Sequence, residues 1–496
     1  MSLYLSYGRD QGAPVDLGSF AGGEASVFPI SNMPGKYSMM LQNCHVSKRS
    51  GISKIPGYVK VNTLSCGVDL KSGYEFKRAD GTSILLCAGG GNIFKVVGDT
   101  LVAVKTGLDP DAVISFGTQN DTCIAGNGVN ALLKSTDGTT WTNLLGSPPA
   151  TGFLPHAHKG RVWTPERTNK LLATCSALNN IEDYVGAGSG YIDFKFVLNQ
   201  GDELLDIKSY IDLLVFLFRN NIAIYSGNTP SGASADFKLV QKIEGTGVVA
   251  SRVAKEFGTD FVLLNDHGVK TLKRIVTSGD LNMGNLSALI DPTLRDEMAN
   301  ASTFGMAYYK PLGWLLVLIK DKVWIYSYTY KAWGRMVGAN VKGMFNTSDG
   351  RLFLCGTGFL YEYGTGWTFA GTNPTMKWDS AWYRLSKAGQ VVYPTVMEII
   401  TYPQVPTTLA LELQFDMKPT AAGNFSTINT TPIGLVDMDS VMDWNAINPF
   451  DETPYNIARI PLFGGGRNMK MIFTNTSDQS VEICNIAMLA KKGAFQ

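Results

Sequence analysis

The chain has few charged residues and no long apolar run. Charged residues make up 17% of its 496 residues, and 43 basic against 42 acidic side chains leave a formal net charge of +1. Such a balance gives no overall attraction to nucleic acid or to an anionic membrane surface. No uninterrupted apolar stretch reaches the roughly 18 residues of a transmembrane helix, so we expect no membrane partner.

Cysteine pairs with metal-ligand spacing are also missing. The seven cysteines are scattered, and two of them, Cys87 and Cys355, lie inside apolar runs, which predicts buried, reduced thiols. The first residues show no basic region followed by an apolar core, so we expect no secretory signal and synthesis in a reducing cytoplasm. The cysteines are Cys44, Cys66, Cys87, Cys123, Cys175, Cys355 and Cys484.

Motifs of known catalytic centres are absent from the sequence. We find no nucleophile elbow, no phosphate-binding loop and no zincin motif. The glycine-rich segment Gly89–Asn92 follows an apolar strand but precedes a second one, Ile93–Val97, which predicts a hairpin turn rather than a dinucleotide loop. The sequence therefore predicts no enzyme, no catalytic residue and no cofactor.

Histidine is rare, with only four residues: His45, His156, His158 and His267. On a strand, His156 and His158 point to the same side, and two imidazoles so placed could begin a metal site. No third ligand stands at a telling spacing. We expect a packing or surface role and no bound metal.

Three groups of acidic residues invite a functional reading. Asp437, Asp439 and Asp443 alternate as calcium ligands do, but they lack the central glycine and terminal glutamate of an EF-hand loop, so we expect a solvated loop. Asp451 with Glu452, or Asp291 with Asp296 and Glu297, could supply glycosidase carboxylates only at a suitable separation, which a sequence does not give. We therefore assign no catalytic pair.

An aromatic cluster follows the strand period. Tyr326, Tyr328, Tyr330 and Trp333 alternate along one segment. We interpret them as core or interface packing; the alternative is a platform on which sugars or bases stack.

What the chain does contain is a repeated pair of short apolar runs joined by a tight polar turn. Paired strands of this kind cannot bury their apolar faces alone and need neighbouring copies, which predicts an all-β fold and most simply a β-propeller. The 53 glycines agree with turn-dense β structure. The clearest copies are Thr82–Val97, Leu213–Tyr225, Phe261–Lys273, Gly313–Trp333 and Gly350–Tyr363.

The pattern predicts three consecutive regions. Residues 1–64 form an irregular segment that is partly an interface, 65–368 form a propeller of six or seven irregular blades, and 369–496 form a β-sandwich-like domain. Asp291–Ser302 predicts a short helix that begins with an Asp cap and a proline. Thr427–Thr453 predicts a long acidic loop, which at that length is expected to bind something or wrap a neighbour. The predicted blades lie near 66–106, 107–148, 152–198, 199–244, 245–303, 304–340 and 341–368.

The order of several segments between about residues 40 and 365 resembles the tail nozzle proteins of short-tailed bacteriophages, also called tail hub or packaged-DNA stabilisation proteins. Tyr37–Val61 is similar to the family's opening, an Asn-containing strand followed by a basic, Gly-containing passage. Gly201–Asn228 looks like the signature blade of the family. The other segments that carry the resemblance are Asp137–Leu144, His158–Tyr184 and Gly245–Leu272.

The resemblance implies a structural virion protein of the phage tail. Six copies would form a ring below the adaptor and portal rings, at the head–tail connection, with tail fibre, needle or plug proteins as further partners. Double-stranded DNA would be retained in the head by this ring and pass through its lumen at ejection without sequence specificity. A low net charge suits such a lumen, because each neutralised phosphate strengthens DNA binding, so we expect lumen-facing loops of mixed or mildly acidic charge.

Two other functions stay open. A carbohydrate-binding or carbohydrate-processing propeller of the tail would need convergent carboxylates and exposed aromatic residues at the mouth of the blades. A cellular scaffold propeller that binds peptides would usually show more regular blades, such as repeated Trp-Asp ends, which are absent from this sequence.

Overall fold

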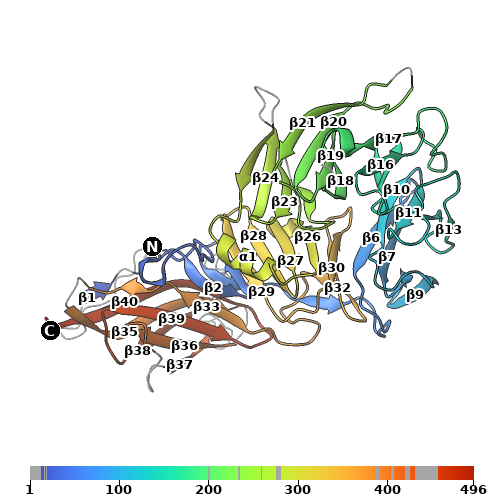
Figure 1. Cartoon of the computed structure of the whole chain (residues 1–496). Helices are drawn as coiled ribbons and strands as arrows, with labels where there is room; N and C mark the ends of the chain where they lie inside the picture. Colours follow the sequence, from blue (N-terminus) through green and yellow to red (C-terminus); the bar gives the residue numbers. More distant parts are fainter. Residues whose placement is uncertain are drawn as a thin grey trace, which may run out of the picture. The chain divides into compact units, whose positions relative to one another are not determined.

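The computed structural model describes residues 13–15, 17, 19–198, 201–232, 235–257, 260–274, 281–386, 390–403, 407–418, 425–430 and 456–495. The chain forms two compact units, which are described separately (Figure 1). Unit 1 comprises residues 1–59, 323–338 and 364–496, and unit 2 comprises residues 60–322 and 339–363. Within the described residues, no helix is both long enough and apolar enough to span a membrane.

Unit 2 is a β-propeller of antiparallel sheets, seen on the right of Figure 1. Its first three blades each have four strands in sequence order. They are β6 (Ser72–Lys77), β7 (Ser83–Gly89), β8 (Asn92–Val97) and β9 (Thr100–Lys105); β10 (Ser115–Gln119), β11 (Thr122–Gly126), β12 (Leu133–Ser135) and β13 (Thr142–Asn143); and β14 (His156–His158), β15 (Arg161–Pro165), β16 (Leu172–Cys175) and β17 (Gly190–Asp193).

Two further blades repeat this plan, and the last two complete the unit. The fourth and fifth blades are β18 (Leu204–Tyr210), β19 (Leu213–Phe218), β20 (Asn221–Ser226) and β21 (Lys238–Glu244), then β22 (Ala254–Phe257), β23 (Asp260–Asn265), β24 (Gly268–Arg274) and β25 (Leu281–Asn285). The sixth contributes β26 (Phe304–Tyr309) and β27 (Trp314–Ile319) to unit 2, and the seventh is β30 (Gly343–Asn346), β31 (Leu352–Cys355), β32 (Leu360–Tyr363) and β5 (Tyr58–Lys60).

The ring of blades is closed by a strand from the beginning of the chain. Each innermost strand neighbours the next, from β6 through β10, β14, β18, β22 and β26 to β30, and β30 neighbours β6 again. Strand β5 completes the seventh sheet, where the amide of Val61 donates to the carbonyl of Leu360 at 2.8 Å. The predicted β-propeller is confirmed, and the open choice between six and seven blades is resolved as seven.

Local sequence explains why the hairpins form where they do. Gly90 and Gly91, with φ of +56° and +74°, form the two-residue turn that pairs Gly89 with Asn92. Both angles are positive, as a type I′ turn requires, and glycine adopts them without steric cost. The expected turn at Gly89–Asn92 is therefore confirmed. All six residues of β19 and of β27 are buried, as expected of strands covered on both faces.

The one α-helix among the described residues is shorter than predicted. Helix α1 (Asp291–Met298) has Pro292 in its first turn, but its N-cap is Ile290, so Asp291 is the first helical residue and not the cap. The expected end at Ser302 is also wrong. Asn300 and Ser302 compete for backbone hydrogen bonds and disfavour further helical turns. Short 3₁₀ helices are η1 (Ile30–Asn32), η2 (Phe194–Phe196) and η3 (Lys310–Leu312).

Unit 1 contains two sheets made from both ends of the chain and from a middle segment, 323–338. One has the order β3-β4-β40-β35-β38, with β1 also paired to β40, and the other includes β28-β29-β2-β33-β39-β36-β37, with β34 paired to β39. The strands are β1 (Ala13–Val15), β2 (Ser38–Gln42), β3 (Cys44–Val46), β4 (Ile52–Lys54), β28 (Lys322–Ser327), β29 (Ala332–Met336), β33 (Met376–Ser380), β34 (Tyr383–Arg384), β35 (Gln390–Pro403), β36 (Thr407–Phe415), β37 (Phe425–Thr430), β38 (Asn456–Pro461), β39 (Asn468–Asn475) and β40 (Val481–Phe495).

The two sheets of unit 1 share one hydrophobic core, so the expected sandwich-like domain is confirmed. Leu411 and Met471 from one sheet belong to the same buried cluster as Ile399 and Met488 from the other. The indole of Trp378 stacks on Phe473 at 5.2 Å and donates from Nε1 to Ser38 Oγ at 2.8 Å.

The domain limits and the acidic loop differ from expectation. Residues 1–59 group with the C-terminal strands instead of forming a segment of their own, because β2 pairs with β33 and β4 pairs with β40. The predicted loop Thr427–Thr453 is wrong at its start, since 427–430 are part of β37 and pair with β36. Its remainder, with Asp437, Asp439 and Asp443, lies outside the described residues, as do Asp451 and Glu452.

Candidate functional site

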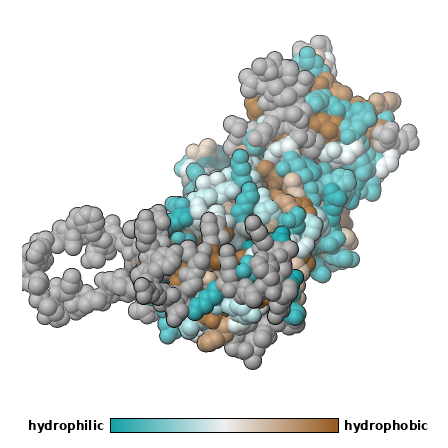
Figure 2. All heavy atoms as spheres, turned by 90° about the vertical axis from the view of Figure 1, so that its left-hand side faces the viewer, coloured by the Kyte–Doolittle hydropathy of each residue, from teal (hydrophilic) through white to brown (hydrophobic). Residues whose placement is uncertain are grey.

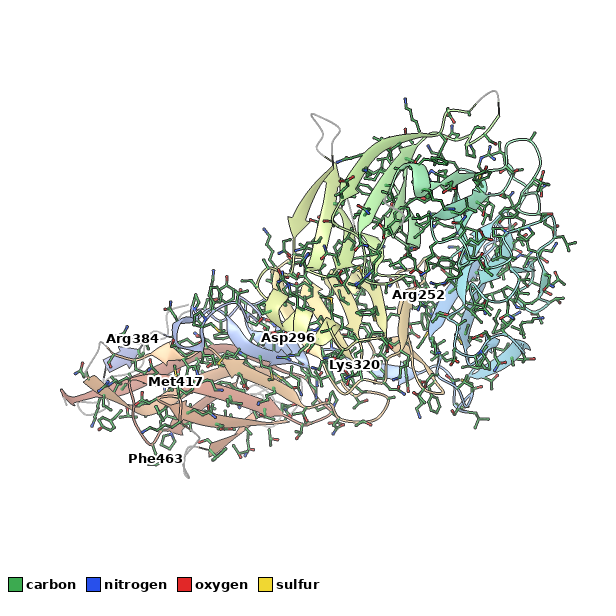
Figure 3. The ribbon with its side chains drawn as sticks, in the orientation of Figure 1. Arg252, Asp296, Lys320, Arg384, Met417 and Phe463 are labelled. Atoms are coloured by element: carbon green, nitrogen blue, oxygen red, sulfur yellow. The ribbon has the colours of Figure 1, made fainter. Side chains whose placement is uncertain are left out.

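The innermost strands of unit 2 surround a cavity of about 540 Å³, which we call the axial cavity. Every blade contributes to its wall. Figure 3 marks Arg252, which lies among these strands. The wall includes Tyr74 of β6, Phe116 of β10, His156 of β14, Ser209 of β18, Lys255 of β22, Phe304 of β26 and Phe345 of β30.

Glycines on the inner strands bring neighbouring blades close enough to enclose this space. A Cβ atom on Gly73 would lie 2.2 Å from the ring of Phe345 in the next blade. A Cβ on Gly117 would lie 2.2 Å from the carbonyl oxygen of Pro155. No real Cβ approaches a neighbour so closely, so a larger side chain at either position would push the blades apart.

Three cations gather on one side of the axial cavity. Lys208 is on β18, Lys255 is on β22, and Arg252 lies just before β22. The carboxylate of Asp206, only 1% exposed, accepts from Lys208 Nζ at 2.9 Å and from the backbone amide of Arg252 at 2.9 Å. Asp206 therefore balances Lys208 and ties the fourth blade to the fifth.

The other two cations are not balanced in this way. No described residue lies within hydrogen-bonding or ion-pairing distance of the Lys255 ammonium, and burial, followed by repulsion from Lys208, lowers the pKa of Lys255 to about 8. Arg252 donates from Nη1 to the carbonyl of Lys71 at 3.1 Å, but its buried Nε has no partner among the described residues. Glu256 is the one carboxylate on the described cavity wall. Its side chain is exposed, and the loss of part of its hydration raises its pKa.

A second hollow of about 380 Å³ shares Arg252 and Phe304 with the wall of the axial cavity. Its wall adds Lys71 and Lys342, opposed by Asp69 and Asp111. Arg252 therefore lies between the two hollows.

The predicted histidine pair lies at the axial cavity. The expectation that His156 and His158 point to one side is confirmed, since His156 Nε2 and His158 Nδ1 contact Ser209 Oγ at 2.9 and 2.8 Å. Burial lowers the pKa of His156 to about 3 and that of His158 to about 4, so both imidazoles are neutral at pH 7. A general base works best with a pKa near the working pH, which makes both poor activators of Ser209.

The other predicted positions do not converge on this cavity. His45 Nδ1 contacts the carbonyl of Val46 at 2.8 Å, and His267 is exposed in the β23–β24 turn. Asp291 accepts from Ser287 Oγ at 2.5 Å, Glu297 pairs with Lys322 at 2.7 Å, and Asp296 is exposed. Among the residues that the structure describes, no three His, Cys, Asp or Glu side chains lie together as metal ligands.

The aromatic cluster is mostly core. Trp333 and Tyr326 are buried and pack at 4.9 Å across the β28–β29 pair. The expected alternation is wrong beyond Ser327, where β28 ends, so Tyr328 and Tyr330 lie in the turn. The seven cysteines are free thiols: Cys66 and Cys484 are half-buried and the other five are buried.

Sequence reasoning missed Lys208, Arg252, Lys255 and Ser209. The signal available was the alternation in Leu204–Tyr210, which puts Asp206 and Lys208 on one face of an innermost strand.

Comparison with known proteins adds the fold class alone. No protein-family model matches the chain, and no curated protein matches it. Among solved structures, the WD40 β-propeller domain of Doa1 is 12% identical (TM-score 0.41; 62% of this chain and 97% of that one), and a streptogramin B lyase is 11% identical (0.42; 62% and 96%). BamB from Moraxella catarrhalis is 9% identical (0.38; 58% and 81%). At these identities the likeness is one of fold.

Proposed function

We propose that this chain is a non-catalytic building block of a short-tailed bacteriophage tail, a nozzle or hub subunit. Six copies form a ring below the portal and adaptor, through which packaged DNA is retained and then released. The observation that carries this proposal is the ordered resemblance of segments between about residues 40 and 365 to that family.

These segments coincide with the framework of the propeller. Tyr37–Val61 contains β2 to β5 and so includes the strand that completes the seventh blade. Gly201–Asn228 covers three strands of the fourth blade, and Gly245–Leu272 leads into the fifth. The resemblance therefore follows the residues that build the ring of blades, which supports a shared architecture.

The mechanical design of unit 2 also suits a wall subunit. Because β5 joins the seventh blade to the beginning of the chain, the circle cannot open without breaking strand pairing. Hydrogen-bonded sheets packed radially resist deformation, which a channel wall needs when DNA is held under pressure.

The cavity chemistry gives no support to the carbohydrate-processing alternative. Glycoside hydrolysis uses two carboxyl groups that flank the scissile bond. The described wall of the axial cavity carries Glu256 alone, beside three cations. We therefore put the structural role forward.

Exposed apolar side chains provide surfaces for subunit contacts. Phe196, 91% exposed, follows the outermost strand of the third blade, and Leu239 and Val240 are exposed on the outermost strand of the fourth. Unit 1 exposes Phe463, marked in Figure 3, at 64%. On the face seen in Figure 2, small hydrophobic groups lie between hydrophilic ones. Single exposed apolar side chains are ordinary on protein surfaces and only large contiguous patches mark contacts, so substitution must show which of these side chains lies in a subunit contact.

Ring formation is the direct test. We expect mass photometry and negative-stain images of the purified full chain to show closed rings of six copies. Phe196→Asp should lower the ring fraction more than Val102→Asp, a matched change at an exposed residue of the first blade. A protein that stays monomeric at every concentration, and is absent from the tails of virions, would contradict the proposal.

DNA binding provides a second test. A lumen that releases DNA should hold it weakly, because affinity and its salt dependence rise with each neutralised phosphate. We expect weak binding of duplex DNA to the isolated protein at low salt. Tight binding that falls steeply with added salt would refute this part of the proposal.

A further inference from the structure

The starting observation is unbalanced positive charge inside unit 2. Lys208, Arg252 and Lys255 lie on one side of the axial cavity, and Asp206 engages the first of them through a 2.9 Å ion pair. Charged groups enclosed by protein are strongly destabilising unless an opposite charge or hydrogen bonds compensate them. Asp206 attracts Lys255 only from beyond ion-pairing distance, and Arg252 Nε has no hydrogen-bond partner among the described residues.

The backbone holds Arg252 in place at a cost. Its φ of +63° lies in the left-handed region, which non-glycine residues rarely adopt. The amide of Arg252 is fixed by Asp206 Oδ2, and its Nη1 by the carbonyl of Lys71. These contacts hold the guanidinium between the axial cavity and the 380 Å³ hollow, and the buried Nε has no hydrogen-bond partner among the described residues.

The rest of the wall suits a small polar ligand. Ser72, Ser115, Thr118 and Ser209 also line this space, and about 540 Å³ is within the range of small-molecule sites. Guanidinium and ammonium groups together with hydroxyls are the donors that bind phosphate oxygens, with Arg providing directed hydrogen bonds and Lys a point charge.

We infer that the axial cavity binds a small phosphate-bearing molecule, held by Arg252, Lys255 and Lys208. The phosphate supplies the negative charge that Asp206 alone does not, and it accepts from the Arg252 guanidinium and from Lys255. This binding site is independent of ring assembly, so it stands or falls separately from the proposed tail function.

Thermal-shift and calorimetric titrations of the full chain at pH 7 test the inference, with inorganic phosphate as the first probe and ionic strength held constant with chloride. We expect saturable stabilisation by phosphate. Lys255→Gln and Lys208→Gln should each weaken binding at least tenfold. Lys238→Gln, on an exposed edge strand, should leave it unchanged.

Two variants separate loss of charge from loss of fold. Lys255→Arg keeps the charge and should retain binding within a few-fold. Glu256→Gln removes the carboxylate of the cavity wall and should tighten binding, because it removes a like charge from the ligand's surroundings. A misfolded protein would not show this increase.

Further probes identify the source of the phosphate. Tighter binding of glycerol 3-phosphate than of inorganic phosphate assigns the cavity to a phosphate monoester, and the reverse assigns it to free phosphate. Binding of a DNA oligonucleotide in the absence of binding by either small probe would overturn the inference. So would phosphate binding that Lys255→Gln leaves unchanged, or no saturable binding of phosphate up to millimolar concentrations.

Discussion

A buried cation is paired with a carboxylate in unit 1, whereas a cation of unit 2 has no such partner among the described residues. In unit 1, Arg335 faces Glu24, with Nη2 and Oε1 2.7 Å apart and side-chain exposures of 14% and 2%. Glu24 Oε2 accepts in addition from the amide of Leu41 at 2.9 Å. In unit 2, the Lys255 ammonium forms no ion pair or hydrogen bond with a described residue, and the repulsion from Lys208 exceeds the attraction of Asp206.

This difference separates a charge that holds structure from a charge that is available for binding. The Glu24–Arg335 pair connects the N-terminal segment to β29, because Glu24 lies beside Ser38 of β2 and Arg335 belongs to β29. Each partner there satisfies the other. Lys255 has no hydrogen-bond or ion-pair partner among the described residues, so a fold that keeps this lysine gives up stability for another purpose.

The largest effect is expected from breaking the paired site. Glu24→Gln leaves the Arg335 guanidinium buried without a counter-charge, and loss of one partner of such a pair typically costs about 3–5 kcal/mol. Urea unfolding of the full chain, followed by tryptophan fluorescence, should show this loss, since Trp378 and Trp324 are buried in unit 1.

Glu244→Gln is the matched control for that change. Glu244 pairs with Lys242 at the surface of unit 2 and is 68% exposed. Exposed pairs contribute about 0–1 kcal/mol, so the variant should unfold almost as the wild type does. Equal destabilisation by both substitutions would show that the Glu24–Arg335 pair does not stabilise the N-terminal segment.

Substitution of the unpaired Lys255 should increase the stability of the chain, whereas Glu24→Gln should decrease it. Lys255→Met removes a charge whose burial is unfavourable, so without phosphate at pH 7 it should raise the free energy of unfolding by about 3 kcal/mol, since the pKa falls from 10.5 to about 8 and each unit of pKa shift is worth about 1.4 kcal/mol. Lys238→Met, at an exposed position, should change stability by less than about 0.5 kcal/mol.

The pH dependence of this gain follows from the pKa of Lys255, about 8 in the folded chain against an ordinary value of 10.5. The charged groups that act on it are Lys208, Arg252 and Asp206, and Glu256 lies on the same cavity wall. Between pH 8 and 10.5 the unfolded chain holds the proton that the folded chain has lost, so wild-type stability rises relative to the variant. A gain that persists at pH 10.5 would contradict burial of charge as its cause.

The contrast between local and long-range structure also explains what the sequence predicted. Hairpins such as Leu213–Tyr225 depend on neighbouring residues, and the strands of the seven blades other than β5 lie within the seven expected intervals. Closure by β5 was not predicted, because its partner β32 follows about 300 residues later and a three-residue strand carries little pattern.

The candidate site could not be predicted from the sequence, because it too depends on contacts between residues far apart in the chain. Along the chain, Lys208 and Lys255 are ordinary polar residues of alternating strands, and only the ring of blades brings them together. His156 and His158 were recognised because their spacing places them on one face of one strand. Their partner Ser209 comes from the next blade, about 50 residues away, and no periodicity reports such a contact.

The smallest effect is expected at the uncharged contact between Ser209 and the two histidines, which is neither an ion pair nor an unpaired charge. Ser209→Ala leaves His156 Nε2 and His158 Nδ1 without the hydroxyl that both contact, which should cost about 1–2 kcal/mol. Ser83→Ala removes an exposed hydroxyl that donates to Glu75 and should cost less than about 0.5 kcal/mol in the same urea titration.

The same comparison at lower pH tests this last prediction further. Burial lowers the pKa of both imidazoles to about 3 and 4, whereas the unfolded chain titrates near 6.5, so wild-type stability should fall as the pH drops from 6.5 toward 4. The hydroxyl contacts neutral rings throughout that range, and the Ser209→Ala loss should therefore be the same at pH 7.5 and pH 5. A loss that vanishes at pH 5 would mean that one imidazole is already protonated in the folded chain, and the cavity would then hold a further positive charge beside Lys208.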